Sequence, residues 1–396
     1  MHEILKGIRV VEQGTFITGP CAAMALADLG ADVIKVEAAG DGDPYRAFGE
    51  GLYSPHFQAY NRNKRAISLN LREPADEAVF RELAGGADVF IQNFRPGAAA
   101  RMGADHARLS ALNPGLVYCS ISGFGPDGPY RDRPSYDSVT QALSGFLSVA
   151  TDPARPRLLG PALADAITGL YAALGVLGAL VERGRSGRGR LVEVSMLEAM
   201  THFAIEPFTT FFALGEAPDA LARPRLAHAC IVACADGRHI GLHLSSLDKF
   251  WRALVEALGG EPLSADPRFA TRPDRIRNYE ALVEALDARF AARTRPEWLA
   301  HLATFDLPHA PLNSVAEAED DAQSRHLGLV VPVAERHEGA ERAIRPAFTF
   351  DGARAPSVRA APRVDEHGAA IRRALAEAPG QWPARPTAAP REEILS

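Results

Sequence analysis

The stretch from Gly7 to Glu37, "GIRVVEQGTFITGPCAAMALADLGADVIKVE", decides the fold. Its first seven residues, "GIRVVEQ", are rich in β-branched side chains and favour a strand. The segment "GPCAAMALADLGA" has helical periodicity, opened by Pro20 and closed by Gly30. "DVIKVE" is a second strand-like run. The stretch therefore predicts a β-α-β unit.

The same alternation continues along the chain. The runs "RAISLNL", "ADVFIQNF", "GLVYCSIS" and "LVEVSM" predict strands, and Pro74 to Ala84 and "AAARMGADHARLSALN" predict helices between them. Such alternation is typical of a parallel sheet with helices on both faces. Ligands of these sheets bind beyond the carboxyl ends of the strands. Four loops are therefore of interest: Gln13 to Pro20, Glu37 to Arg46, Asn93 to Gly97 and Gly123 to Tyr136.

The length of 396 residues predicts at least two domains, because a single core stops growing at about 250–300 residues. The fold class is α/β: a large domain with a Rossmann-like parallel sheet plus a smaller α+β domain. The expected parts are the N-terminal section of the large domain (1–200), an aromatic linker (201–224), the small domain with a hairpin at Asp236-Gly237 (225–318), a return to the large domain (319–378) and a proline-rich tail (379–396).

Composition excludes several classes of protein. A net charge of −6 gives no basic field for nucleic acid. The four cysteines, Cys21, Cys119, Cys230 and Cys234, are too scattered for a disulfide framework and lack a second pair at zinc spacing, so we expect no metal. The N-terminus lacks a signal-peptide pattern, and the apolar run from Ala166 to Val181 is shorter than the ~20 residues that span a bilayer. We expect a cytoplasmic protein without membrane contact.

The familiar nucleotide and hydrolase motifs are missing. The turn "GTFITGP" has no G-x-G-x-x-G, which argues against a nicotinamide dehydrogenase. No P-loop and no G-x-S-x-G is present, which argues against ATP hydrolysis and an ordinary serine hydrolase.

Basic residues gather near the predicted ligand loops. Arginine grips phosphate with two hydrogen bonds, so such a set suits a multiply phosphorylated ligand such as coenzyme A. Each one taken alone is more often a solvated surface charge. The set comprises Arg62, Lys64, Arg65, Arg72, Arg95, Arg101, Arg131 and Arg133.

One carboxylate, Asp165, stands at the start of an otherwise apolar helix, "ALADAITGLYAAL", that is predicted to run to about Arg183. Pro161 suits the first helical position. The free N–H groups and dipole of the helix start stabilise an anion, which would keep a partly desolvated carboxylate ionised. Such a group is a good nucleophile. An ordinary acid placed there for dipole reasons is an equal alternative.

Longer blocks carry a family resemblance. They include "GPCAAMALADLGADVIKVE", "NRNKRAISLNL", "ADVFIQNFRPGAAARMG", "LNPGLVYCSISGFGPDGPYRDRPSYDSVTQALSG", "DAITGLYAALGVLGALVERGRSGRGRLVEVSM" and "LPHAPLNSV". In order and spacing the chain resembles the class III CoA-transferases, the family of formyl-CoA transferase, crotonobetainyl-CoA:carnitine CoA-transferase and α-methylacyl-CoA racemase.

The resemblance implies that Asp165 is the catalytic nucleophile, forming an aspartyl anhydride and then an aspartyl-CoA thioester. It implies CoA and acyl-CoA as substrates, no permanently bound cofactor and an interlocked homodimer. The family's CoA-contacting positions fall on Ile17, Leu69, Asn70, Leu71, Arg72, Asn93, Phe94, Arg95, Arg101, Arg133 and Tyr136.

Some positions depart from the family pattern. Ile17 and Ala38 stand where some transferases have glutamine and arginine, so two polar contacts are expected to be missing. The glycine-rich loop of formyl-CoA transferase has no counterpart between Pro224 and Leu244, which disfavours formyl-CoA and oxalate as substrates. Arg46 is a candidate partner for the distal carboxylate of a dicarboxylic substrate.

Two alternative functions remain. A racemase needs a second acid/base, but its histidine would fall at Tyr136 and its assisting glutamate near Ser245 or Ser246, which favours a transferase. A CoA-binding protein without catalysis would gain little from Asp165. The acids that are exchanged cannot be read from the sequence.

Overall fold

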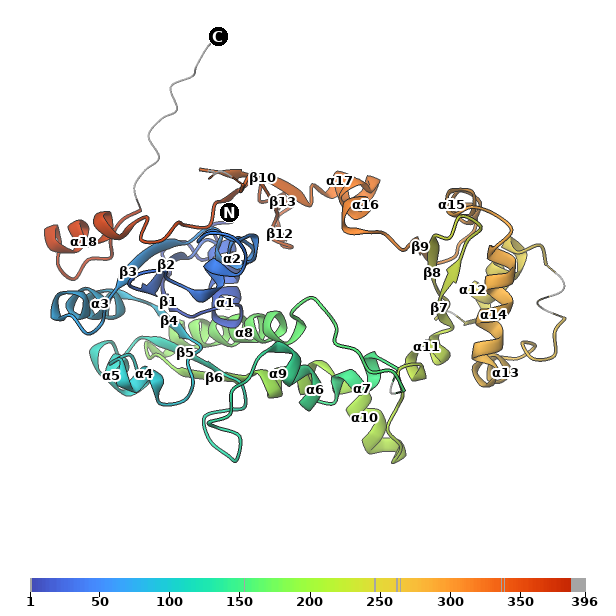
Figure 1. Cartoon of the computed structure of the whole chain (residues 1–396), viewed down its shortest axis with the longest axis horizontal. Helices are drawn as coiled ribbons and strands as arrows, with labels where there is room; N and C mark the ends of the chain where they lie inside the picture. Colours follow the sequence, from blue (N-terminus) through green and yellow to red (C-terminus); the bar gives the residue numbers. More distant parts are fainter. Residues whose placement is uncertain are drawn as a thin grey trace, which may run out of the picture. The chain divides into compact units, whose positions relative to one another are not determined.

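The computed structural model describes residues 2–385 except 153, 246, 261, 262, 264, 336 and 338. These residues divide into two compact units (Figure 1). The first comprises the described parts of Met1–Phe146, Leu158–Ile205 and Leu327–Ser396, and the second those of Leu147–Arg157 and Glu206–His326.

A six-stranded parallel sheet forms the centre of the first unit. Its order is β3-β2-β1-β4-β5-β6, the order of the doubly wound Rossmann fold. The predicted α/β class with a parallel sheet is confirmed. The strands are β1 (Arg9–Gln13), β2 (Asp32–Ala38), β3 (Arg65–Leu69), β4 (Val89–Gln92), β5 (Val117–Ser122) and β6 (Leu191–Ser195).

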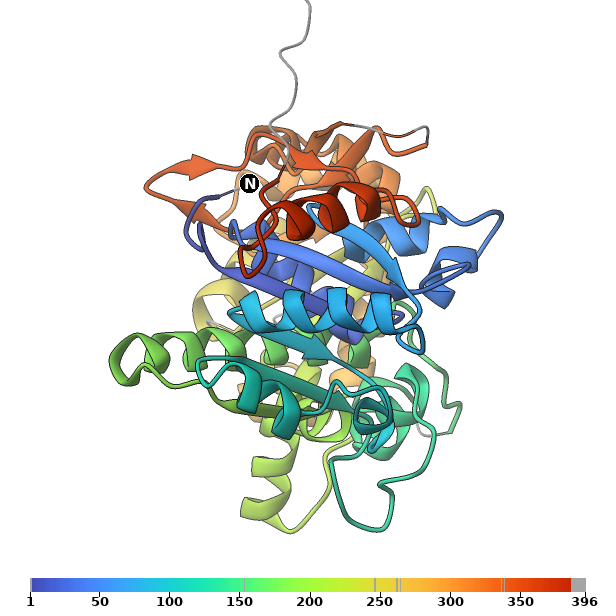
Figure 2. The same ribbon diagram turned by 90° about the vertical axis from the view of Figure 1, so that its left-hand side faces the viewer.

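Helices cover both faces of this sheet because its strands carry apolar side chains on both sides. Helices α1 (Thr18–Asp28) and α8 (Leu163–Ser186) pack on one face, over a core that includes Val10 and Val117. Helices α3 (Pro74–Gly86), α5 (His106–Leu112) and α18 (Gly368–Glu377) lie across the other face (Figure 2), over a core that includes Phe80 and Phe90.

Some element boundaries differ from the prediction. The helix predicted from residue 98 is two helices, α4 (Ala98–Arg101) and α5, because Gly103 adopts a left-handed φ of 71° and Asp105 caps a new start. Helices α9 (Met196–Phe203), α10 (Ile205–Leu214) and α11 (Ala222–Ala227) occupy most of the expected linker. Helix α8 begins at Leu163, two residues after Pro161.

The second unit contains the predicted hairpin, β7 (Ala229–Ala233) and β8 (His239–His243), joined by β9 (His309–Pro311). Trp251, Phe269, Phe290 and Trp298 contribute to its core. Most of α7 (Phe146–Ala150), α10 and α17 (Ala322–Leu327) belongs to this unit. The helices that lie wholly within it are α11, α12 (Leu247–Ala257), α13 (Arg272–Arg277), α14 (Tyr279–Phe290), α15 (Arg295–Leu302) and α16 (Val315–Asp320).

The chain then adds small strands to the first unit: β10 (Val330–Ala334), β11 (Arg342–Ile344), β12 (Thr349–Phe350), β13 (Ala353–Arg354) and β14 (Val358–Arg359). The start of the proline-rich tail is anchored, since Trp382 Nε1 donates to Asp32 Oδ2 at 2.8 Å. Residues 386–396 of that tail lie outside the described residues.

Among the described residues, one helix, α8, is long and apolar enough to cross a membrane. Its Ala172, Val176 and Ala179 are buried in the core beneath the sheet. This is how the core helix of a globular protein packs.

Candidate active site

Two cavities of the first unit lie where β1 and β4 end, the point at which the strand order reverses. The Asp165 cavity, about 280 Å³, is lined by Ile17, Asn93, Arg95, Arg133, Tyr136 and Asp165 among others. The strand-end cavity, about 600 Å³, is lined by Leu69, Asn70, Leu71 and Arg72 among others. Thr15 and Phe94 line both, so the two cavities adjoin.

The structure thus brings together every predicted site residue except Arg101. Arg101 is exposed on α4 and lines neither cavity, although its neighbour Met102 lines the strand-end cavity.

The turn after β1 is held in an uncommon conformation. Phe16 has a left-handed φ of 58°, which a bulky residue adopts only where its surroundings impose it. Its N–H donates to Asp43 Oδ1 at 3.0 Å. Asn93 accepts from Thr15 N at 2.9 Å and donates to Thr15 O at 2.7 Å. The amide of Asn93 therefore shapes the cavity wall and is already occupied.

A buried ionic cluster, which the sequence analysis missed, lies beneath this turn. Lys35 Nζ is 3.1 Å from Glu12 Oε1 and 2.9 Å from Asp43 Oδ2, and Lys64 Nζ is 3.1 Å from Glu12 Oε2. All four side chains are buried, and burial lowers the pKa of Lys64 to about 8. Lys35 also donates to Gly14 O at 2.9 Å, so the cluster fixes the turn.

Several residues of the basic set are structural. Arg62 pairs with Asp28, Lys64 with Glu12 and Arg65 with Asp32. The expectation for Arg46 is wrong as well: this side chain is fully buried, binds both oxygens of Glu37 at 2.7 Å and donates to Pro362 O.

Besides Arg131, which pairs with Asp132 at 3.3 Å, three arginines at the cavities keep exposed guanidinium groups. Arg72 lines the strand-end cavity, and Arg95 and Arg133 line the Asp165 cavity. No ion pair joins any of the three to another described residue. The Arg133 guanidinium lies over the Tyr130 ring, 3.8 Å from its centroid. These cations are therefore available to an anionic ligand.

Asp165 occupies the first turn of α8, as predicted, but its charge is not stabilised there. The N–H groups of Ala164 and Asp165 donate instead to Asp137 Oδ1, at 2.7 and 3.2 Å. Burial, followed by the negative charge of Asp137, raises the pKa of Asp165 to about 7. The expectation that the helix start keeps this carboxylate ionised is wrong, because Asp137 occupies the N–H groups that would stabilise the charge.

The positions at which a racemase would carry its acid/base groups offer none here. Tyr136 is 61% exposed, and its ring meets that of Phe16 edge-on at 5.9 Å. Ser245 hydrogen-bonds His243 within the second unit, and Ser246 lies outside the described residues.

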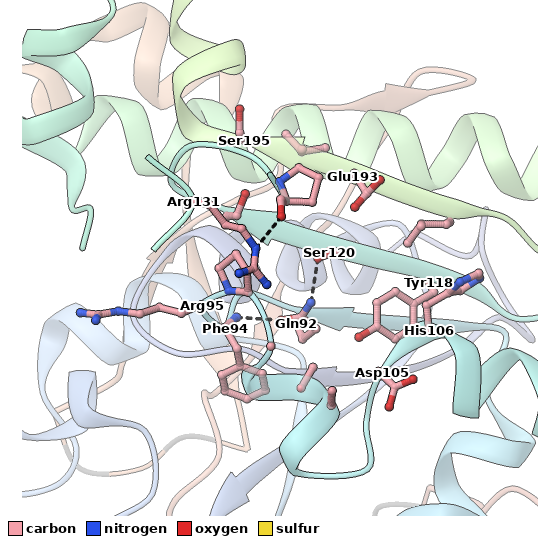
Figure 3. A pocket seen from close by; sticks show the side chains of 18 of the residues that line it. Gln92, Phe94, Arg95, Asp105, His106, Tyr118, Ser120, Arg131, Glu193 and Ser195 are labelled. Atoms are coloured by element: carbon pink, nitrogen blue, oxygen red, sulfur yellow. Dashed lines mark hydrogen bonds between the residues drawn. The ribbon is translucent and has the colours of Figure 1, made fainter. Parts of the chain in front are cut away.

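A third cavity of about 270 Å³ lies against β4, β5 and β6 (Figure 3). Gln92 on its wall donates to Ser120 Oγ at 2.8 Å and accepts from Phe94 N at 2.7 Å (Figure 3), so it positions a residue of the two main cavities. No group of three or more His, Cys, Asp or Glu side chains among the described residues is arranged to hold a metal.

Comparison with known proteins agrees with this geometry. The family model described as CoA-transferase family III matches residues 5–368. The chain belongs to CoA-transferase family III. It is therefore an enzyme of the transferase class.

Its relatives include the acetyl-CoA:oxalate CoA-transferase of Acetobacter aceti, 33% identical over 93% of this chain and 95% of the relative. The succinate–glutarate CoA-transferase of Agrobacterium fabrum is also 33% identical, over 93% of this chain and 94% of the relative. A CaiB/BaiF family protein from Brucella suis has a similar structure, with a TM-score of 0.84 and 34% identity over 95% of this chain and 100% of that one.

Proposed function

We propose that this family III enzyme moves CoA from an acyl-CoA to a free carboxylic acid, with Asp165 as the nucleophile. The observation that carries the proposal is the placement of Asp165. Its carboxylate lines a small cavity that adjoins, at Thr15 and Phe94, a larger one with an exposed arginine. In this arrangement the thioester group of the substrate binds in the first cavity, and the rest of CoA extends along the second.

The reaction then runs through covalent intermediates. An Asp165 oxygen attacks the thioester carbonyl carbon, the C–S bond breaks, and CoA thiolate leaves a mixed anhydride on Asp165. The thiolate attacks the aspartyl carbonyl carbon and releases the first acid as a carboxylate. The second carboxylate attacks the resulting aspartyl-CoA thioester, and the thiolate returns to the new anhydride, which yields the new acyl-CoA and free Asp165.

The exposed arginines have separate tasks in this proposal. Arg72, in the strand-end cavity, binds a phosphate of CoA. Arg95 and Arg133 line the same cavity as Asp165, where their positive charges attract anionic substrates. The other proposed CoA contacts, Ile17, Leu69, Asn70, Leu71, Asn93, Phe94 and Tyr136, line the two cavities, whereas Arg101, on α4, lines neither.

We propose short dicarboxylic acids as the exchanged substrates. A relative named for succinate and glutarate supports this class. The small cavity also presents Arg131 and Arg133, which suit a second carboxylate. A panel of mono- and dicarboxylate acceptors, tested on the enzyme and on Arg131→Ala, would show a selective loss of dicarboxylate use.

We further propose a cytoplasmic homodimer, interlocked as in the family, without a permanently bound cofactor. Exposed apolar side chains on α8 support dimerisation: Leu170, Leu174 and Val181 are 56%, 64% and 68% exposed.

Trapping tests the nucleophile directly. Enzyme mixed with acyl-CoA and quenched during turnover should carry a CoA adduct on Asp165, and hydroxylamine should convert that residue to a hydroxamate, both visible by peptide mass spectrometry. Asp165→Asn should lose transfer by at least about 10³-fold. The exposed Asp127→Asn is the matched control. Proton exchange next to the thioester carbonyl without any adduct would instead indicate a racemase and refute the proposal.

A further inference from the structure

Asp137 caps the helix that carries Asp165, although it belongs to a different helix, α6 (Asp137–Leu143). Its Oδ1 accepts from the N–H groups of Ala164 and Asp165, the second and third residues of α8. Those are the groups that an N-cap side chain normally binds. Ala162, which stands in the cap position of α8, has no side chain able to do so.

The second oxygen of Asp137 is fixed as well. Gln141, one turn further along α6 and fully buried, donates from Nε2 to Asp137 Oδ2 at 2.6 Å. The same nitrogen lies 3.4 Å from the carbonyl oxygen of Leu159, ahead of α8. The carboxylate of Asp137 is therefore held in one orientation, between α6 and the start of α8.

We propose that Asp137 is a positioning residue for CoA transfer: it fixes the first turn of α8 and, by occupying that turn's N–H groups with its own negative charge, keeps the Asp165 carboxylate poorly stabilised and reactive. This inference rests on the proposed role of Asp165 as nucleophile. It assigns to Asp137 no contact with the reacting atoms.

The other groups that face Asp165 do not replace this effect. Cys21 of α1, Tyr45 of η1 (Pro44–Ala47) and Tyr60 of α2 (Pro55–Asn61) have pKa values raised by burial and, to a lesser degree, by the charge of Asp165, so they are neutral at pH 7. Three arginines, Arg95, Arg131 and Arg133, line the cavity with exposed guanidinium groups. Asp137 is thus the one described charge that adds to burial in raising the pKa of Asp165.

This arrangement favours acylation. Attack on a thioester converts the anionic Asp165 carboxylate into a neutral acyl group. Repulsion from Asp137 and the loss of hydration therefore raise the free energy of the free carboxylate but not that of the acyl-enzyme. A more basic carboxylate is also the stronger nucleophile once it is ionised. The expected result is a larger population of acyl-enzyme and faster attack.

Asp137→Asn separates charge from position, because the amide oxygen still accepts the two N–H groups and Gln141, whose Oε1 has no partner among the described residues, can turn its amide over to accept from the new NH2 group. In ligand-free enzyme labelled with ¹³C at aspartate carboxyl carbons, the titration midpoint of Asp165 should fall by about one pH unit. The acid limb of kcat/KM should move down equally, and kcat at pH 8 should fall about threefold. The Asp165→Asn protein identifies the resonance.

Two further variants complete the test. Asp137→Ala also removes the cap, so amide exchange at Ala164 and Asp165 should accelerate. Asp105→Asn, a matched control, removes the same cap charge from α5 and should leave the Asp165 midpoint unchanged.

An unchanged midpoint, or an unchanged pH profile, in Asp137→Asn would overturn the inference. The NMR titration needs no turnover, so it is independent of the proposed function. The midpoint could move as expected while the Asp165→Asn variant still transfers CoA. That result would refute the role of Asp165 as nucleophile and, with it, the role of Asp137 in catalysis.

Discussion

At the scale of single residues, Asp165 illustrates how a functional group is placed at a cost to stability. Its pKa in the folded protein, about 7, lies above the ~3.9 of an unfolded chain. Between these values the folded state keeps a proton that the unfolded state has lost, so stability falls as the pH rises through this window.

Asp165→Asn carries no charge and should escape this loss. We expect the variant to be more stable than the wild type by about 2 kcal/mol at pH 8, a rise in the thermal midpoint of about 4 °C, with the difference vanishing towards pH 4. Thermal unfolding at pH 4, 6 and 8 checks this, with Asp127→Asn as the control. Parallel stability curves for Asp165→Asn and wild type would contradict the raised pKa.

Arg72 provides a second test at this scale. Its exposed guanidinium lines the strand-end cavity without an ion-pair partner among the described residues. Removal of one charge-assisted bond to phosphate in Arg72→Ala should raise KM for acyl-CoA about tenfold and leave kcat nearly unchanged. The effect should shrink at high salt. Arg81→Ala, which removes an exposed charge on α3, is the control, and an equal change in both variants would argue against phosphate binding.

The residue type alone does not show which arginines are available to a ligand and which are held in structural ion pairs. Arg46 and Arg72 are the same residue type and follow the neighbouring strands β2 and β3, yet Arg72 is exposed and Arg46 is buried against Glu37. Asp165 was recognisable because its neighbours along the chain are apolar. Its partner Asp137 is 28 residues away and meets it only through the packing of two helices. Local sequence carries no signal for that contact.

At the scale of elements, the turn after β1 depends on the ionic cluster beneath it. Asp43 joins the two, since it accepts from Phe16 N and pairs with Lys35. Asp43→Asn removes one of the negative charges that pair with the buried Lys35. Such a loss typically lowers the free energy of unfolding by about 3–5 kcal/mol. We expect a lower thermal midpoint together with a raised KM for acyl-CoA, because the Phe16 turn lines the Asp165 cavity.

Unfolding scans and steady-state kinetics on the same sample check both effects. Asp41→Asn, an exposed acid in the same loop, is the control. A destabilised Asp43→Asn enzyme with unaltered KM would show that the cluster serves stability alone.

Elements with strong periodicity were predictable, and those decided by tertiary contacts were not. The predicted strands agree with the observed ones because runs of Val and Ile that are buried on both faces favour a strand over other structures. Two strands do carry a signal for the ionic cluster: Glu12 and Lys35 lie inside apolar runs, and charges in central strands must be paired. The break at Gly103 depends on a left-handed backbone conformation that one glycine permits but does not require.

At the scale of the whole molecule, alternation of strand and helix sufficed to predict the parallel sheet, and it places the expected ligand loops at the carboxyl ends of the strands. The volumes of the cavities did not follow from it. They depend on side chains from distant parts of the sequence, such as Arg133 in a loop and Asp165 in the first turn of α8.

The exposed face of α8 leads to a prediction about assembly. Leu170, Leu174 and Val181 follow helical spacing, so they form one apolar stripe. Burial of one leucine at a subunit contact contributes about 1.5–3 kcal/mol. Leu174→Glu should therefore weaken the proposed homodimer by at least about tenfold to a hundredfold. Ile344→Glu, at an apolar side chain of similar exposure on β11, should not.

Sedimentation velocity across a concentration series measures this difference. If subunits are interlocked, exchange between tagged and untagged wild-type dimers should also be slow, because separation requires part of the chain to unfold. A wild-type protein that sediments as a monomer at every concentration would refute the dimer. The apolar stripe on α8 would then need another occupant, and the complete active site would have to lie within a single chain.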